Sequence, residues 1–342
     1  MLMTSVAFGR FLWEFYPLCS CSLTGFSSQK HLASCNFVVP SSQQNTAGMV
    51  QDFRYFFQIA RPLNVAISMI AFSVACMLAN HGSVEFVTNE GFWATALMIA
   101  LIAGTGYWIN DVYDFRIDRI NKPRKTVVNA ILSVKKVVTV YICMLVTILA
   151  FSGGIIGWRM GYYHITFINA LSILLLFLYA SYLKRVGIPG NLTISFLIAL
   201  VILLAGYLYE ITVPLVWAMV FAFEITLIRE ITKDVEDIRG DLSFDLRTLP
   251  IQIGIRQTKT VLFFLYISLL VSTWLPFLYS WWDKHELLWT YLLTSIFLVQ
   301  IPTIFLQLHM SRSSDPRDFG YQSQGLKLIM VLGMVTLFFL QV

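Results

Sequence analysis

Long apolar segments alternate with short polar loops along the chain from residue 49 onward. Each segment is close to the roughly 20 apolar residues that a helix needs to cross the hydrocarbon core of a bilayer. Gly and Pro mark several of the loops between them, as in the run from Gly187 to Gly190. The pattern predicts nine transmembrane helices, with approximate bounds of 62–80, 92–110, 134–153, 163–182, 191–209, 213–230, 260–280, 286–307 and 325–342.

The basic residues of the loops predict an orientation for these helices. If the residue-49 end lies in the cytoplasm, the cytoplasmic loops hold 20 Lys and Arg residues, and the opposite loops hold only Arg159 and Lys284. Lys and Arg accumulate on the cytoplasmic side of membrane proteins, and this bias alternates correctly through all nine predicted helices. We therefore expect a cytoplasmic N-terminal end, an external C-terminus, and two large polar loops that face the cytoplasm.

The composition agrees with an all-α integral membrane bundle. The chain is 57% hydrophobic and 13% charged, and its mean hydropathy is +0.71. Soluble proteins contain about 25% charged residues, so a soluble domain of this length would lack the polar surface that it needs. The net charge of +5 comes from short loops between apolar segments, so the expected partner is the lipid bilayer and no nucleic acid is expected.

Residues 1–48 differ in composition from the rest of the chain. They contain one acidic residue, Glu14, and two basic residues, Arg10 and Lys30, among many Ser, Cys and Phe residues. Targeting peptides are also poor in acids, but they are richer in Arg and more clearly amphipathic than this segment. We interpret residues 1–48 as a disordered extension, or as sequence upstream of a start at Met49. Residues 49–342 are expected to form one transmembrane domain.

Two aspartate motifs follow the second and the sixth predicted helices. In each motif three aspartates are spaced by three and then four residues, and a constant offset of 123 residues relates the two sets. Residues at i, i+3 and i+7 share one face of a helix, so each motif should present its carboxylates in a column. Asn110 lies on the stripe of the first column. The aspartates are Asp111, Asp114, Asp118, Asp234, Asp237 and Asp241.

Carboxylates at this spacing repel one another unless a cation lies among them. Mg²⁺ prefers carboxylate oxygens and commonly also binds substrate phosphates. The alternative is a pair of solvated acidic helix ends that local Lys and Arg residues balance. Because the same spacing occurs at two helix ends on one side of the membrane, we predict that the six aspartates and Asn110 bind Mg²⁺ ions that bridge a diphosphate. Asp114 and Asp237 are predicted to be catalytic.

Basic residues beside the motifs suit the same chemistry, because a leaving diphosphate needs positive charge. Lys184 and Arg124 are the best candidates for substrate contact, and Lys184 is predicted to be catalytic. Lys122 and Lys233, together with Asn110, are further candidates for diphosphate binding. The alternative is that these bases only orient helices in the membrane, which explains some of them.

Aromatic and acidic residues inside the predicted helices are weaker candidates. Aromatic faces stabilise cations, and the departure of an allylic diphosphate leaves a carbocation. Helix packing and interfacial positions explain most of these aromatic residues equally simply. Glu224 lies within the sixth predicted helix and is either a functional acid or a buried, hydrogen-bonded carboxylate. The aromatic residues near the motifs are Tyr107, Trp108, Tyr113, Tyr179 and Tyr182.

Four elements of the sequence, Arg61–Asn64, Asn110–Asp118, Tyr179–Arg185 and Asp234–Asp241, match signatures of one family. From Phe56 to its C-terminus the chain resembles the UbiA superfamily of membrane prenyltransferases. The resemblance implies nine transmembrane helices around a central cavity, with a cytoplasmic cap of polar loops. It also implies Mg²⁺-assisted ionisation of a polyprenyl diphosphate donor, followed by attack of a lipophilic acceptor on the allylic carbon.

The sequence indicates the acceptor less specifically than the donor. The segment Arg229–Asp241 resembles bacterial members named geranylgeranylglycerol-phosphate geranylgeranyltransferases, which implies geranylgeranylglyceryl phosphate as acceptor and a bacterial inner membrane with the site facing the cytoplasm. However, many members continue after Asn121–Pro123 with an Arg-Pro-x-Pro-x-Gly run that Arg124–Asn129 does not match. One alternative is an aromatic prenyltransferase of quinone synthesis, of the 4-hydroxybenzoate or homogentisate type. A transporter is a different class, but transporters usually place their acids near the bilayer midplane rather than at helix ends.

Overall fold

A computed structural model describes residues 41–123, 126–284, 288–313, 315 and 318–340. Residue contacts divide the chain into two units, Met1–Thr46 and Ala47–Val342, and the second holds every helix from α3 onward. Within the described residues the secondary structure is helical apart from an isolated bridge between Val128 and Leu132, which confirms the all-α prediction. The predicted extension 1–48 lies mostly outside these residues.

The helical segments include α-helices, three π-helical turns and two short 3₁₀ turns. The π-helical turns are η2, η3 and η4, and the 3₁₀ turns are η1 and η5. In chain order the segments are α2 (Ser41–Ile59), α3 (Pro62–Ala79), η1 (Glu85–Thr88), α4 (Glu90–Asn121), α5 (Val134–Phe151), η2 (Ser152–Arg159), α6 (Tyr163–Leu178), η3 (Tyr179–Leu183), α7 (Lys184–Val186), α8 (Ile188–Leu208), α9 (Val213–Glu236), α10 (Ile238–Ser243), α11 (Leu249–Lys284), α12 (Trp289–Ser295), η4 (Ile296–Gln300), α13 (Ile301–Arg312), α14 (Asp318–Leu337) and η5 (Phe338–Leu340).

Each predicted membrane segment corresponds to a helix or to a run of consecutive helical segments among the described residues. Eight of these are long and apolar enough to cross a membrane. The predicted segment 213–230 is the exception, because its helix α9 carries Glu224, Arg229 and Glu230 within an otherwise apolar sequence. α9 packs against α8, α11 and α14, so much of its surface contacts protein.

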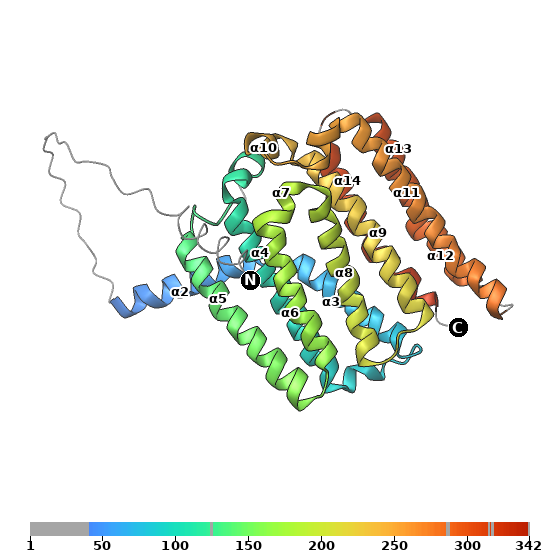
Figure 1. The fold of residues 1–342 in the computed structure, drawn as a ribbon, viewed down its shortest axis with the longest axis horizontal. Coiled ribbons are helices and arrows are strands. Elements are labelled where there is room, and N and C mark those ends of the chain that lie inside the picture. Colours follow the sequence, from blue (N-terminus) through green and yellow to red (C-terminus); the bar gives the residue numbers. More distant parts are fainter. Residues whose placement is uncertain (1–40, 124–125, 285–287, 314, 316–317, 341–342) are drawn as a thin grey trace, which may run out of the picture. The chain divides into compact units, whose positions relative to one another are not determined.

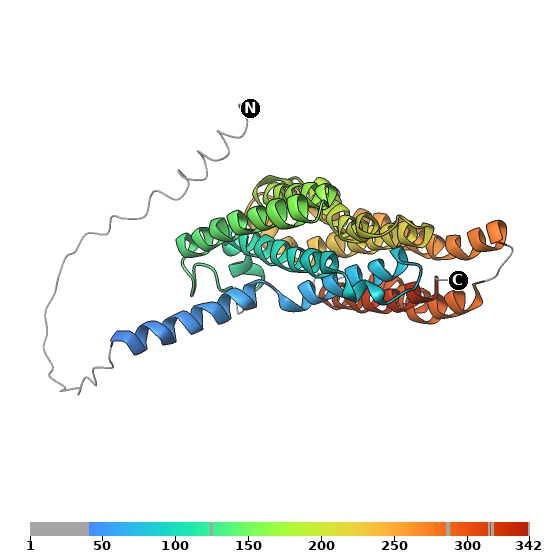
Figure 2. The same ribbon diagram turned by 90° about the horizontal axis from the view of Figure 1, so that it is seen from below.

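The helices of the second unit lie next to one another as a bundle, in which α9 is flanked by α8 and α11 (Figure 1). The view at right angles shows that the helices occupy more than one layer (Figure 2). They surround a cavity of about 260 Å³ that is lined by residues of α3, α4, α6, α8, α9, α11 and α14 among others. The cavity agrees with the prediction of a bundle around a central space.

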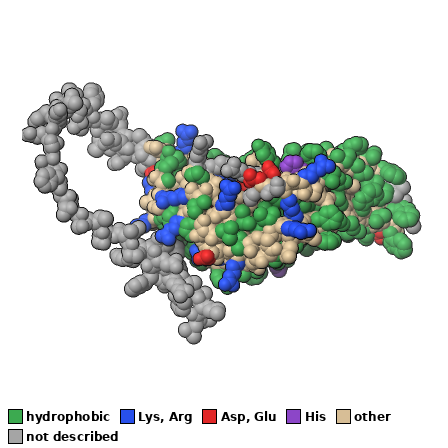
Figure 3. Space-filling view, turned by 90° about the horizontal axis from the view of Figure 1, so that it is seen from above, with side chains coloured by type: hydrophobic (Ala, Val, Ile, Leu, Met, Phe, Trp, Pro, Cys, Tyr) green, Lys and Arg blue, Asp and Glu red, His purple; other side chains and the backbone are tan. Residues whose placement is uncertain are grey.

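Charged side chains gather at one end of this bundle. The C-terminal ends of α4 and α9 meet there, because α10 follows α9 directly and packs against α4. Figure 3 views this end, and Lys, Arg, Asp and Glu side chains appear on it among apolar ones. Both aspartate motifs therefore lie at the same end of the bundle.

Candidate active site

The first motif lies on one continuous helix, as predicted. α4 runs without interruption to Asn121 and carries Asn110, Asp111 and Asp114 in its last four turns. Asp114 is buried, and its Oδ2 atom accepts a hydrogen bond from Asn110 Nδ2 at 2.8 Å. Asp111 Oδ1 forms an ion pair with Arg61 Nη2 at 2.6 Å. Arg61 precedes α3, so this pair ties the start of α3 to the motif.

Lys184 reaches the first motif from a different part of the chain. Its Nζ atom donates to Asp114 Oδ2 and forms an ion pair with it. The π-helical turn η3 ends directly before Lys184, and the short helix α7 ends at Val186 and is followed by Gly187, whose φ of 88° is left-handed. A Cβ atom at Gly187 would collide with the carbonyl oxygen of Arg247, so this position requires glycine. The loop is held there by a bond of 2.9 Å from Arg247 N to Arg185 O.

The second motif does not lie on one helix, contrary to the sequence-based expectation of a second straight column. α9 ends at Glu236, Asp237 has φ and ψ of −89° and 5°, and α10 begins at Ile238. Asp234 therefore belongs to α9 and Asp241 to α10. Asp234 Oδ2 accepts a hydrogen bond of 2.8 Å from the buried Asn191 on α8.

We infer that contact with the end of α4 sets this break. Asn121, the last residue of α4, donates from Nδ2 to the carbonyl oxygen of Asp237 at 3.0 Å and accepts from the Gly240 N–H at 2.9 Å. These bonds satisfy backbone groups where α9 ends. A Cβ atom at Gly240 would lie 2.6 Å from Cγ of Asn121, so the approach needs glycine. Lys122 Nζ adds an ion pair of 2.9 Å with Asp237 Oδ2.

Lys184 interacts electrostatically with aspartates of both motifs, Asp114 of the first and Asp241 of the second. Burial raises the pKa of Asp241 to about 6, Lys184 opposes this shift, and the negative charges of Asp237 and Asp114 add to it. Burial alone would lower the pKa of the Arg61 guanidinium, but Asp111 and other negative groups nearby outweigh burial and raise it. The carboxylates of both motifs thus act on one another and on a shared set of cations.

The remaining predicted site residues do not all lie at the cavity. Lys233 lines the cavity, whereas Arg124 lies outside the described residues. Tyr107 and the buried Tyr179 line the cavity, but Tyr182 is 63% exposed.

Three further predicted residues have packing or hydrogen-bonding contacts. Trp108 Nε1 donates to the carbonyl oxygen of Phe56 at 3.0 Å, which is a packing role. Tyr113 packs edge-on against Phe177. Glu224 accepts a hydrogen bond of 2.6 Å from Ser268 and does not line the cavity, which favours the interpretation as a hydrogen-bonded carboxylate.

Sequence reasoning gave no role to three polar residues that position the motifs, Arg61, Asn121 and Asn191. Asn191 follows Gly190 at the start of an apolar segment, where an amide has no other evident partner. Arg61 and Asn121 enter the sequence analysis only through family motifs. For Arg61 and Asn191 the sequence offers a signal, a polar residue at the boundary of an apolar segment, whereas Asn121 lies in a polar stretch and gives none.

The donor atoms of the site fit Mg²⁺ in their chemistry. The motifs supply six carboxylates, and Asn110 Oδ1 is a buried acceptor with no partner among the described residues. As placed, the described residues include no group of three or more His, Cys, Asp or Glu side chains that could hold a metal ion. Three of the aspartates instead pair with Arg61, Lys184 and Lys122. Metal binding would therefore exchange some of these cations for the ion.

The family model for UbiA prenyltransferases matches residues 68–338, which is most of the chain. The chain belongs to the UbiA prenyltransferase family. This match confirms the predicted resemblance and the prediction of a prenyl-transferring enzyme of the membrane. The matched UbiA region contains both aspartate motifs, Lys184 and most of the residues that line the cavity.

Among curated UbiA relatives, the digeranylgeranylglyceryl phosphate synthase of Saccharolobus solfataricus is 31% identical over 229 residues, which cover 65% of this chain and 77% of that protein. The enzyme of the same name from Methanopyrus kandleri is 27% identical over 282 residues, covering 82% and 97%.

Solved UbiA structures share the fold. A chain from a study of digeranylgeranylglyceryl phosphate synthase in membranes has a TM-score of 0.62 at 22% identity, covering 84% of this chain and 98% of that one. A UbiA homologue from Archaeoglobus fulgidus bound to GPP and Mg²⁺ has a TM-score of 0.54 at 14% identity, covering 82% of this chain and 99% of that one.

Proposed function

We propose that this UbiA protein transfers a geranylgeranyl group from geranylgeranyl diphosphate to geranylgeranylglyceryl phosphate. The observation that carries the proposal is the arrangement of two acidic motifs around Lys184, at one end of a bundle that encloses an apolar cavity. Such a site suits a substrate with an anionic head and a long hydrocarbon chain. The choice of acceptor is supported by the relatives from Saccharolobus solfataricus and Methanopyrus kandleri, which are named for that product.

In this proposal the donor diphosphate lies at the aspartate motifs. Lys184 and Lys122, each paired with a motif aspartate, supply positive charge to the leaving group, and Lys233 and Arg124 are further candidates for this contact. The bond between the allylic carbon and the diphosphate oxygen breaks. The acceptor hydroxyl oxygen forms an ether bond to that carbon, and the hydroxyl proton and diphosphate are released. The hydrocarbon chains occupy the apolar cavity, which limits access of water to the cation.

The six motif aspartates and Asn110 would hold Mg²⁺. The ion, when bound, neutralises charge on the departing diphosphate. Support comes from the Archaeoglobus fulgidus homologue, which was solved with GPP and Mg²⁺. Asp114 and Asp237 would act at the centre of the two motifs, because each is the middle aspartate of its set and accepts a bond from a lysine.

A product assay tests the proposal. The purified protein in lipid nanodiscs would receive labelled geranylgeranyl diphosphate, Mg²⁺ and either glycerol phosphate lipids or phenols such as 4-hydroxybenzoate, and product masses would be measured. We expect a digeranylgeranyl product that disappears on chelation and returns with added Mg²⁺. If the protein makes a prenylated phenol instead of the ether lipid, the proposed acceptor is wrong and the acceptor is an aromatic compound. Undiminished activity in the presence of the chelator would refute the metal role.

The protein is an integral membrane protein, and we propose that its site faces the cytoplasm. The bias of basic residues toward the end that holds both motifs supports this orientation. A cysteine introduced at the exposed Arg239, in a background in which all five native cysteines are replaced, should react with a membrane-impermeant maleimide only when the cytoplasmic side is accessible. The relatives named above are archaeal, and the expected bacterial inner membrane stays a prediction.

A further inference from the structure

The cavity contains a basic region that the aspartate motifs do not explain. Of the described residues that line it, four are basic and only Glu230 is acidic. None of the six motif aspartates is among the lining residues. The four basic residues are Arg61, Arg229, Lys233 and Lys327.

Two of these cations are neutralised by carboxylates. Arg61 pairs with Asp111 at 2.6 Å, and Arg229 Nη1 pairs with Glu230 Oε1 at 2.5 Å. The other two have no such partner within the described part of the chain. Lys327 Nζ donates to the neutral amide oxygen of Asn64 at 3.0 Å. Lys233 forms no ion pair with a described residue, so the region carries an excess of positive charge.

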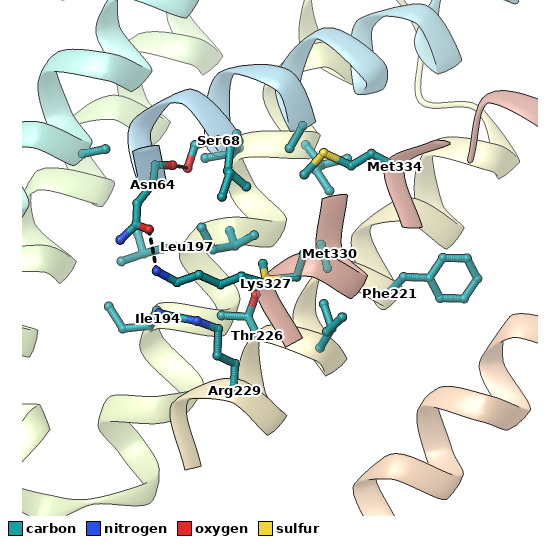
Figure 4. A pocket seen from close by; sticks show the side chains of 18 of the residues that line it. Asn64, Ser68, Ile194, Leu197, Phe221, Thr226, Arg229, Lys327, Met330 and Met334 are labelled. Atoms are coloured by element: carbon teal, nitrogen blue, oxygen red, sulfur yellow. Dashed lines mark hydrogen bonds between the residues drawn. The ribbon is translucent and has the colours of Figure 1, made fainter. Parts of the chain in front are cut away.

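The position of Lys327 makes this excess unusual. Lys327 lies in α14, within a segment apolar enough to span a membrane, and Figure 4 shows its side chain extending to Asn64 on α3. Arg229 extends from α9 toward the same region (Figure 4), and its charge acts on Lys327 together with those of Lys233 and Arg61, against the opposing charge of Glu230. The Nε atom of Arg229 is a buried donor with no partner among the described residues. Uncompensated charges in apolar surroundings are unfavourable, so the region is suited to an anion.

We propose that Lys327, together with Arg229, binds the phosphate group of the acceptor lipid. This inference rests on the proposed function and adds the residues that recognise the acceptor's head group. Apolar side chains line the rest of the cavity, including Leu197 and Met330 near the two cations and Phe221 farther from them, and they suit the attached hydrocarbon chain (Figure 4).

The arrangement separates two anionic groups. The donor diphosphate belongs to the aspartate motifs, whereas the acceptor phosphate lies at the basic region of the cavity. Lys233 is at the boundary, because its charge acts on Asp234 and Asp241 as well as on Lys327. A glycerol hydroxyl is separated from its phosphate by only a few bonds, so an anchored phosphate holds that hydroxyl near the donor.

Substitution of Lys327 tests the inference. Lys327→Gln removes the charge but keeps an amide N–H that can donate to Asn64, and Lys327→Arg keeps the charge. KM would be measured for geranylgeranylglyceryl phosphate, for geranylgeranylglycerol without the phosphate, and for the donor. We expect the Gln variant to raise KM for the phosphorylated acceptor roughly 10- to 100-fold, the loss expected for one charge-assisted hydrogen bond. The Arg variant should recover most of this loss.

The other two substrates make the test specific. KM for the donor should stay unchanged, and the wild-type protein and the Gln variant should bind the phosphate-free acceptor equally. Lys259→Gln is a matched control, because Lys259 donates to the carbonyl oxygen of Ser313 and does not line the cavity. It should leave all three KM values unchanged.

The following results would overturn the inference. An unchanged KM for the phosphorylated acceptor in Lys327→Gln means that the charge does not bind phosphate. An equal loss for both acceptors, or a raised donor KM with a lower melting temperature, means that Lys327 only ties α14 to α3. With any of these results for the Gln variant the proposed function stands, because the wild-type protein makes the product. A wild-type protein that makes no product from any glycerol phosphate lipid refutes the proposed function itself, and the inference with it.

Discussion

The two aspartate motifs share their residue spacing, but their backbones differ. The first lies on the unbroken helix α4, whereas the second is divided between α9 and α10 at Asp237. The division coincides with the place where Asn121 bonds to the backbone of the second motif. One motif therefore owes its geometry to helix periodicity, and the other owes it to a contact from the first. Identical spacing in a sequence does not by itself produce two identical columns of carboxylates.

The largest expected effect comes from removing the middle charge of each motif. Asp114→Asn and Asp237→Asn preserve shape and delete one carboxylate each, so both should lower turnover by more than about 100-fold. If the motifs are halves of one site, the two losses should be similar. Initial rates with labelled donor would be compared with melting temperatures of the same samples. Near-normal turnover in either variant would show that its motif does not serve the reaction.

A smaller effect is expected from the contact that shapes only the second motif. Gly240→Ala places a methyl group against Asn121 and should destabilise the protein by ~1–3 kcal/mol. Gly153→Ala is the matched control, because a Cβ atom at Gly153 meets nothing within 4 Å. The melting temperature and turnover of both variants would be measured.

A second substitution sharpens this comparison. Asn121→Ala should reduce the additional cost of Gly240→Ala, because the clash partner is gone and neighbouring substitutions are not additive. Additive losses in the double variant would contradict the proposed origin of the break.

The smallest effect is expected from the ion pair that crosses between the motifs. Lys122→Gln removes the partner of Asp237, and turnover should fall by about tenfold, as for one charge-assisted hydrogen bond. Lys136→Gln breaks a similar pair with Asp52 at a more exposed position and should leave turnover unchanged. Equal effects of the two substitutions on turnover would mean that Lys122 contributes only general surface charge.

Hydropathy was sufficient to predict the helical body, because burial in lipid requires long apolar segments whatever their neighbours are. α9 shows the limit of that argument, since Arg229, Glu230 and Lys233 of this helix line the cavity. The first motif was also predictable, because its face follows from helix periodicity alone.

The rest depended on contacts between distant parts of the chain. The break at Asp237 arises from Asn121, more than 100 residues earlier, and no local sequence pattern predicts it. Lys327 has no assigned role in the sequence, where it lies inside the last predicted membrane segment between Leu326 and Leu328. Its role emerges only when α14 packs beside α3 and α9. Arg124, a predicted substrate contact, lies outside the described residues and stays a prediction.

The π-helical turn η3 has a consequence for the position of Lys184. A π turn accommodates one residue more than regular α-helix does over the same path. Winding the same residues between Tyr179 and Leu183 as regular α-helix would therefore rotate Lys184 by about 100° around the helix axis, away from Asp114. The lysine would still be present in the sequence, in the same order and with the same neighbours. The winding of the turn before Lys184 is thus as much a requirement of the site as the lysine itself.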